Sequence, residues 1–107
     1  MRRVLFIAFL VLAPSARAQI AGGWSVIEQP SEDHDAREAG IALVRHLPVK
    51  NVSLRHIERA SRQVVAGTNF RLTIKLTNGR LWCGTVWRKL DGTYVVSRVA
   101  RVRSLPS

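Results

Sequence analysis

The strictest constraint on the fold is a run of alternating residues between Thr68 and Thr77. Apolar side chains alternate there with polar or charged ones, in the order Asn69, Phe70, Arg71, Leu72, Thr73, Ile74, Lys75, Leu76. Because successive side chains of a strand point to opposite faces, this run predicts a strand with one face in a core and the other in water. Asn78-Gly79 follows, a pair typical of a two-residue hairpin turn in which both residues have positive φ.

That turn predicts how the next strand, Arg80 to Lys89, pairs with the first. A two-residue turn sets these residues opposite one another on the apolar face: Leu76 and Leu81, Ile74 and Cys83, Leu72 and Thr85, Phe70 and Trp87. Cys83 is therefore expected in the core, and as the single cysteine it forms no internal disulfide. Asp91-Gly92 is the next turn, and Thr93 to Arg103 is the last strand. Its register stays open between a two-residue and a three-residue loop.

A helix is expected earlier in the chain. It opens at Pro30-Ser31-Glu32-Asp33, where either Ser31 or Asp33 can cap it. Small and apolar residues recur at helical spacing along one face, at Ala36, Gly40, Leu43 and Leu47. Arg45 and His46 suit the negative end of the helix dipole, and Pro48 ends the helix.

Two further strands complete the predicted fold. Val52 to Val65 reads as a long strand, and a phase slip of its apolar residues near Arg55-His56 indicates a bulge that would bend it. Trp24 and Ile27 predict a short first strand after Gly22-Gly23. The order of elements indicates the α+β class, with one helix packed on a curved antiparallel sheet of four to five strands.

The first residues resemble a secretory signal. Arg2 and Arg3 precede an apolar run from Val4 to Leu12, which is too short to span a bilayer, and Ala16-Arg17-Ala18 suits a signal peptidase. We expect a signal peptide at residues 1–18, a domain at 19–107, and a secreted or periplasmic protein without a membrane span once cleaved. The alternative is an uncleaved membrane anchor.

The net charge is +10, and removal of Arg2, Arg3 and Arg17 leaves fourteen basic against seven acidic side chains, or +7. Such a charge suits acidic partners or simply a solvated basic face. The predicted strands contribute these basic residues to one sheet face: Arg55, Arg59, Arg62, Arg71, Lys75 and Arg98. The histidines are scattered, and no nucleophile, metal or phosphate motif is present, so we expect no enzyme activity, metal or cofactor.

A five-residue stretch at the expected tip of the first long hairpin carries a family resemblance. Gln63-Val64-Val65-Ala66-Gly67 resembles the inhibitory hairpin of the cystatins, protein inhibitors of papain-like cysteine proteases. The resemblance extends from about Gly22 to Val99 and is strongest from Gln63 to Phe70. It implies a cystatin-like fold of the type without disulfides, and it implies that the chain inhibits such proteases. We expect the inhibitor to be a monomer.

The resemblance also implies a wedge of three parts. Gly22 or Gly23 would precede a segment that enters one side of the protease cleft, Gln63 to Gly67 would enter near the catalytic cysteine, and a second hairpin would lie on the other side. Cystatins carry Pro-Trp in that second hairpin, where this chain has Leu90-Asp91. Loss of a buried aromatic anchor costs about 2 kcal/mol or more of binding, so weaker or narrower inhibition is expected.

The alternative function is a cystatin-fold binding protein without inhibitory activity, whose basic face binds a polyanion or an acidic protein. Neither nucleic acid nor another polyanion is the partner we expect first, and we expect no small-molecule substrate. For nucleic acid, the reason is that Trp82 and Trp87 are predicted on opposite faces and form no common stacking platform. Asn51-Val52-Ser53 is an acceptor sequence for N-glycosylation if the host is eukaryotic.

Overall fold

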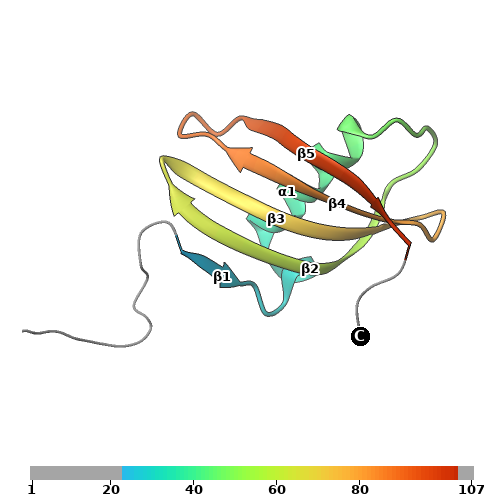
Figure 1. The fold of residues 1–107 in the computed structure, drawn as a ribbon, viewed down its shortest axis with the longest axis horizontal. Helices are drawn as coiled ribbons and strands as arrows, with labels where there is room; N and C mark the ends of the chain where they lie inside the picture. The colour runs from blue at the N-terminus through green and yellow to red at the C-terminus, as the bar shows by residue number, and fades with distance from the viewer. Residues whose placement is uncertain (1–22, 104–107) are drawn as a thin grey trace, which may run out of the picture.

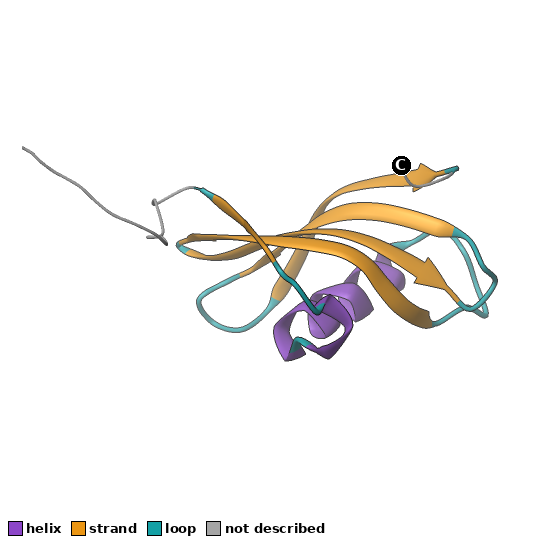
Figure 2. Cartoon of the chain, turned by 90° about the horizontal axis from the view of Figure 1, so that it is seen from below, coloured by secondary structure: helices purple, strands orange, loops and turns teal. Residues whose placement is uncertain are grey.

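The computed structural model describes residues 23–103; the predicted signal peptide and Gly22 lie outside this range. Its elements are β1 (Trp24–Val26), the short 3-10 helix η2 (Pro30–Glu32), α1 (His34–His46), β2 (Leu54–Val65), β3 (Gly67–Leu76), β4 (Leu81–Arg88) and β5 (Tyr94–Val102). The strands form one antiparallel sheet in the order β1-β2-β3-β4-β5. Helix α1 lies across one face of that sheet, which curves over it (Figures 1 and 2). The predicted α+β architecture of one helix on an antiparallel sheet is confirmed.

The core forms between α1 and the inner face of the sheet, the face that the helix covers. The predicted helix face of Ala36, Gly40, Leu43 and Leu47 is buried, and Ala39 joins it. The alternation in β3 is also confirmed, because its apolar residues are buried under the helix: Phe70, Leu72, Ile74 and Leu76. The opposite, outer face of the sheet has no helix over it within the described residues (Figure 2).

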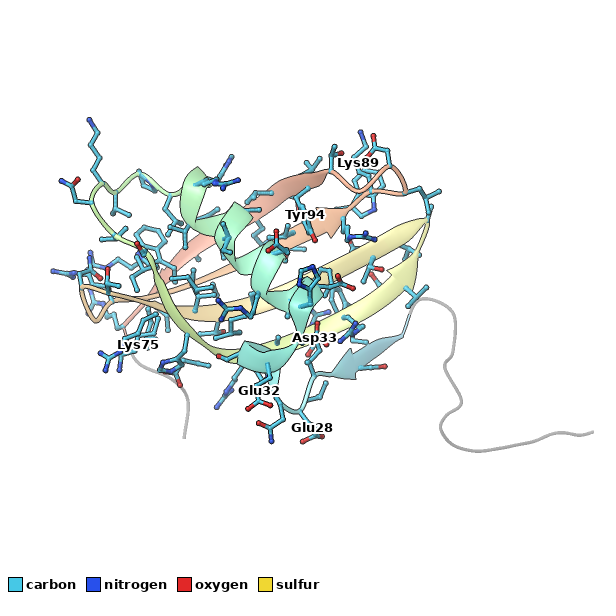
Figure 3. All side chains as sticks on the ribbon, turned by 180° about the vertical axis from the view of Figure 1, so that it is seen from behind. Glu28, Glu32, Asp33, Lys75, Lys89 and Tyr94 are labelled. Carbon is cyan, nitrogen blue, oxygen red and sulfur yellow. The ribbon has the colours of Figure 1, made fainter. Side chains whose placement is uncertain are left out.

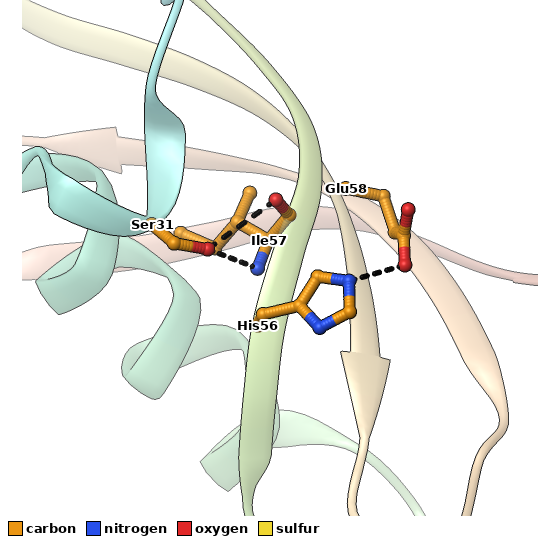
Figure 4. A network of polar contacts seen from close by, with 4 residues as sticks. All are labelled: Ser31, His56, Ile57 and Glu58. Atoms are coloured by element: carbon orange, nitrogen blue, oxygen red, sulfur yellow. Dashed lines mark hydrogen bonds and ion pairs between the residues drawn. The ribbon is translucent and has the colours of Figure 1, made fainter.

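Asp33, one of the two candidate caps, begins α1. Its carboxylate accepts a hydrogen bond from the Ala36 amide at 2.9 Å and forms an ion pair with Arg62 of β2. Partial burial acts to raise the pKa of Asp33, but the Ala36 amide and the Arg62 guanidinium outweigh it and hold that pKa below its usual value. Ser31 has a different role: its hydroxyl accepts from the Ile57 amide at 2.9 Å and ties η2 to β2 (Figure 4).

Two irregularities bend β2. Its pairing with β3 slips between Leu54 and His56, as predicted, and again between Ile57 and Arg59. The Nε2 atom of His56 is in hydrogen-bond contact with the Glu58 carboxylate at the second slip, on the side of β2 away from Ser31 (Figure 4). Bulges increase the local bend of a strand, which is how β2 follows the helix.

The predicted pairing of β3 with β4 is wrong by one residue. The chain turns through three residues, Thr77, Asn78 and Gly79, because the Leu76 amide donates to the Arg80 carbonyl at 2.9 Å. Only Gly79 has a positive φ, +83°, as in a type I turn followed by a glycine bulge. Ile74 is therefore opposite Trp82 and Thr73 opposite Cys83.

A shift of one residue moves every side chain of β4 to the other face. Cys83, expected in the core, is half-buried on the outer face, and Trp87, expected opposite Phe70, is opposite Asn69 on the same outer face. Val86 and Gly84 take the inner positions, and Gly84 lies directly against Leu43 of the helix. The prediction that Trp82 and Trp87 lie on opposite faces holds, with the two faces exchanged.

Strand β5 resolves the register that the sequence left open. A three-residue loop, Leu90 to Gly92, joins it to β4, and Ser97 bulges between the pairs Val86–Val96 and Thr85–Arg98.

Asn51 is exposed in the connection before β2, with φ of 59°. Neither helix in residues 23–103 is long and apolar enough to cross a membrane.

Candidate functional site

The segment Gln63 to Gly67 forms the tip of the hairpin between β2 and β3. Val65 is opposite Gly67, so Ala66 alone turns the chain. The valines of this tip project into solvent, with 58% of Val64 and 41% of Val65 exposed. Apolar side chains exposed close together on a protein surface are candidates for contact with another molecule.

Strand β4 braces this tip from the side. The indole N–H of Trp87 donates to the Ala66 carbonyl at 2.9 Å. Gly67 has a φ of +94°, and a Cβ atom at this position would lie 2.2 Å from the Arg88 carbonyl oxygen. Only glycine therefore permits this close approach of β3 to the end of β4.

The loop from Leu90 to Gly92 forms a second tip. Leu90 points outward with 82% of its surface exposed, whereas Asp91 is engaged within the loop. The Asp91 carboxylate accepts from the Thr93 hydroxyl at 2.7 Å and from the Thr93 amide at 2.9 Å. Both hydrogen bonds lower the pKa of Asp91, and the one from the hydroxyl has the larger effect. The exposed apolar surface of this tip is therefore that of Leu90, whereas the Asp91 carboxylate stabilises the turn.

The start of β1 lies beside the first tip. Trp24 is opposite Gln63, and Gly23 immediately precedes it. The side-chain oxygen of Gln63 accepts a hydrogen bond from the side-chain amide of Asn69 at 2.9 Å across the hairpin. On the outer face, the Arg71 guanidinium carbon lies 3.7 Å from the centre of the Trp24 ring, a cation–π contact that links β1 to β3.

These three segments lie at the same end of the sheet. Figures 1 and 2 both show the start of β1, the β2–β3 tip and the β4–β5 loop together, away from the β3–β4 turn. We call this end the apex, defined by Gly23, the tip residues Val64 to Ala66, and Leu90. Five strands spaced by about 4.8 Å make it about 19 Å wide. The structure thus brings together every candidate binding residue that it describes, from Gly23 to Asp91.

Two residues near the apex were not recognised from the sequence. Trp87 was expected in the core, and Arg71 was expected only as part of a basic face. The sequence signal for Trp87 was Gly84, because a glycine in the middle of a strand often marks a close approach of another element. Because Gly84 faces the helix and Trp87 lies three residues later on the same strand, Trp87 must point to the outer face.

The basic face forms in part. Arg59, Arg71, Lys75 and Arg98 lie on the outer face, as their partners in the sheet ladder indicate. Arg62 does not, because it alternates to the inner side, pairs with Asp33 and lies over the Phe70 ring. Arg55 is exposed in the first bulge of β2.

The chemistry of the apex is that of a contact surface. Its exposed groups are aliphatic side chains and backbone, while within residues 23–103 no three side chains of the kind that bind metals gather in one place. Comparison of the chain with models of protein families and with curated proteins found no match.

Proposed function

We propose that the chain is a cystatin-like, exported inhibitor of papain-like cysteine proteases and that it acts through the apex. The observation that carries this proposal is the exposure of Val64, Val65 and Leu90 on two neighbouring tips. The likeness of Gln63-Val64-Val65-Ala66-Gly67 to the cystatin hairpin supplies the class of target.

Inhibition by this apex is steric. The first tip enters the cleft of the protease, and the segment at Gly23 and the Leu90 loop lie on either side of it. The tip is already held by the Trp87 bond and by its ladder to β3, so binding orders little of the chain. Each exposed valine or leucine that becomes buried contributes about 1–2 kcal/mol. No bond of the inhibitor has to be cleaved.

The second tip is the weaker part of the proposed wedge. Leu90 offers an aliphatic contact where cystatins offer an aromatic ring, and Asp91 remains bonded to Thr93. We therefore expect the first tip to supply most of the affinity and the inhibition to be weaker than that of a cystatin with Pro-Trp.

The test is a titration of papain with the chain from Gln19 onward. We expect inhibition at micromolar concentration or below, competitive with substrate, and an unchanged mass of the inhibitor afterwards. Val64→Glu is expected to weaken inhibition by tenfold or more, because it places a charge in the region that must lose its water.

The matched control is Val26→Glu on the edge strand β1. Val26 is also exposed, at 72%, but it is opposite Ser61, five residues from Ala66 along β2 and thus about 16 Å from the tip. It adds the same charge, and we expect it to leave inhibition unchanged. An equal loss in both variants, or no inhibition by the unaltered chain at micromolar concentration, contradicts the proposal.

A further inference from the structure

A second surface lies on the outer face of the sheet, away from the apex tips. It is a shallow trough of about 840 Å³ that crosses the middle of β2, β3, β4 and β5. Exposed arginines line it from three different strands: Arg59 on β2, Arg71 on β3 and Arg98 on β5. Hydroxyl side chains lie between them, at Ser61, Thr73, Thr85 and Ser97.

The sheet ladder determines the spacing of the arginines. Arg71 and Arg98 both lie opposite Thr85, one on each side, so their strands are about 10 Å apart. Arg59 is opposite Thr73, one strand away from Arg71 and two residues along, which gives about 8 Å. These are backbone spacings, and long arginine side chains anchored at such intervals can reach repeated negative charges on an extended ligand.

The charge distribution favours such a ligand. No acidic side chain lines the trough. The labelled Glu28, Glu32 and Asp33 lie around η2 and the start of α1, on the side shown in Figure 3. The trough arginines differ in how they are held: Arg71 is stacked on Trp24, whereas the Arg98 guanidinium forms no hydrogen bond or ion pair within residues 23–103. A guanidinium fork binds carboxylate and sulfate oxygens through paired hydrogen bonds.

We propose that this trough binds a linear acidic polysaccharide bearing carboxylate or sulfate groups. Its hydroxyl side chains suit the hydroxyl groups of sugars. None of its lining residues is aromatic, so it lacks the stacking platform on which unpaired nucleobases bind. Its floor consists of strands already paired in the ladder, so a peptide has no free backbone edge there to extend. The proposal is separate from protease inhibition, since none of the trough arginines belongs to either tip, although Arg71 also contacts Trp24 at the start of β1.

The experiment measures binding of a heparin octasaccharide to the chain from Gln19 onward by calorimetry at about 0.1 M salt, where surface charges are partly screened. The test variant combines Arg59→Gln, Arg71→Gln and Arg98→Gln. The control combines Arg37→Gln, Arg45→Gln and Lys50→Gln, exposed residues on α1 and the segment after it that remove the same charge. We expect the Kd to rise at least tenfold in the trough variant and less than twofold in the control, with papain inhibition unchanged in the control.

Several outcomes overturn the proposal. They are no binding by the unaltered chain, an equal loss in both triple variants, or tighter binding of an oligothymidylate of equal charge at the same salt concentration. Should circular dichroism show that the trough variant is unfolded, Arg98→Gln alone replaces it, because that side chain holds no other described residue. It is expected to raise the Kd about threefold, the loss of one of three cationic contacts, and an unchanged Kd refutes the assignment.

Discussion

Gly67 and Gly92 are each the last residue of a hairpin tip, and each has a positive φ, +94° and +87°. Their surroundings differ. A Cβ atom on Gly67 would lie 2.2 Å from the Arg88 carbonyl oxygen, whereas one on Gly92 would meet nothing within 4 Å. The pair therefore separates the cost of the backbone conformation from the cost of the contact between β3 and β4.

We expect Gly92→Ala to lower the free energy of unfolding by about 1 kcal/mol, the cost of a non-glycine residue at positive φ. Gly67→Ala carries the same cost plus a backbone clash, so a loss of about 3 kcal/mol or more is expected. Urea unfolding of both variants measures the difference. Equal losses would mean that β3 and the end of β4 are farther apart than described.

Among the elements, β4 and the β2–β3 hairpin are joined at the apex by a side chain. The Trp87 indole donates to the Ala66 carbonyl, and Ala66 is the one residue of that turn outside both strands. The bond lies on the surface, so it contributes little to overall stability, but it restrains the position of the tip.

Trp87→Phe removes the donor and keeps an aromatic ring. We expect a loss of about 1 kcal/mol or less in unfolding free energy and faster hydrogen exchange at Val65, Ala66 and Gly67. Trp24→Phe is the control, because it retains a ring face for Arg71 and removes no bond to the tip. Unchanged exchange at the tip in Trp87→Phe would show that the ladder alone holds it.

The start of α1 is coupled to β2 through Asp33. The pKa of the Asp33 carboxyl is lower in the folded chain than in the unfolded chain, so the unfolded chain binds the proton of this carboxyl more tightly. The resulting stability is present above the unfolded pKa, about 3.9, and is lost as the pH falls through the folded value.

Asp33→Asn keeps an oxygen acceptor for the Ala36 amide and removes the charge that pairs with Arg62. We expect this variant to be less stable than the unaltered chain at pH 6 by up to about 1 kcal/mol, and the gap to close below pH 4. Asp33→Ala also loses the cap, a further cost of about 1 kcal/mol. Urea unfolding from pH 6 to pH 2.5 measures both, and a gap independent of pH would refute the role of the charge.

For the molecule as a whole, the register of β4 decides which residues meet the helix. Gly84 faces α1, and a Cβ atom there would lie 2.7 Å from both the Leu43 side chain and the Arg98 carbonyl oxygen. Cys83 faces the other way and is half-buried. The predicted register would exchange these two environments.

Gly84→Ala is therefore expected to lower the unfolding free energy by about 2 kcal/mol, as overpacking of a core does, whereas Cys83→Ser is expected to cost less than about 1 kcal/mol. Thermal unfolding compares them. If Cys83→Ser were costly and Gly84→Ala were tolerated, the result would instead support the two-residue turn and the register that it implies.

Much of the fold and part of the candidate site follow from local patterns. The alternation in β3, the helical spacing from Ala36 to Leu47 and the bulge in β2 were predictable, because each depends on neighbours in the chain. So was the hairpin tip at Gln63 to Gly67. The positions of Trp87 and Cys83 were not, because Asn78-Gly79 suits both a two-residue and a three-residue turn. The fit of Gly84 under Leu43 accompanies the three-residue form.

The sequence by itself determined the order of elements, the faces of α1 and β3, and the residues at the tips, since propensity, period and turn chemistry act over a few residues. The tertiary structure alone decided which residues of β4 face the helix, that Arg62 leaves the basic face for Asp33, and that Arg59, Arg71 and Arg98 line one trough. These outcomes depend on register and on contact between distant segments. A shift of a single residue scarcely alters the local pattern of a strand, but it moves all the side chains of that strand to the other face.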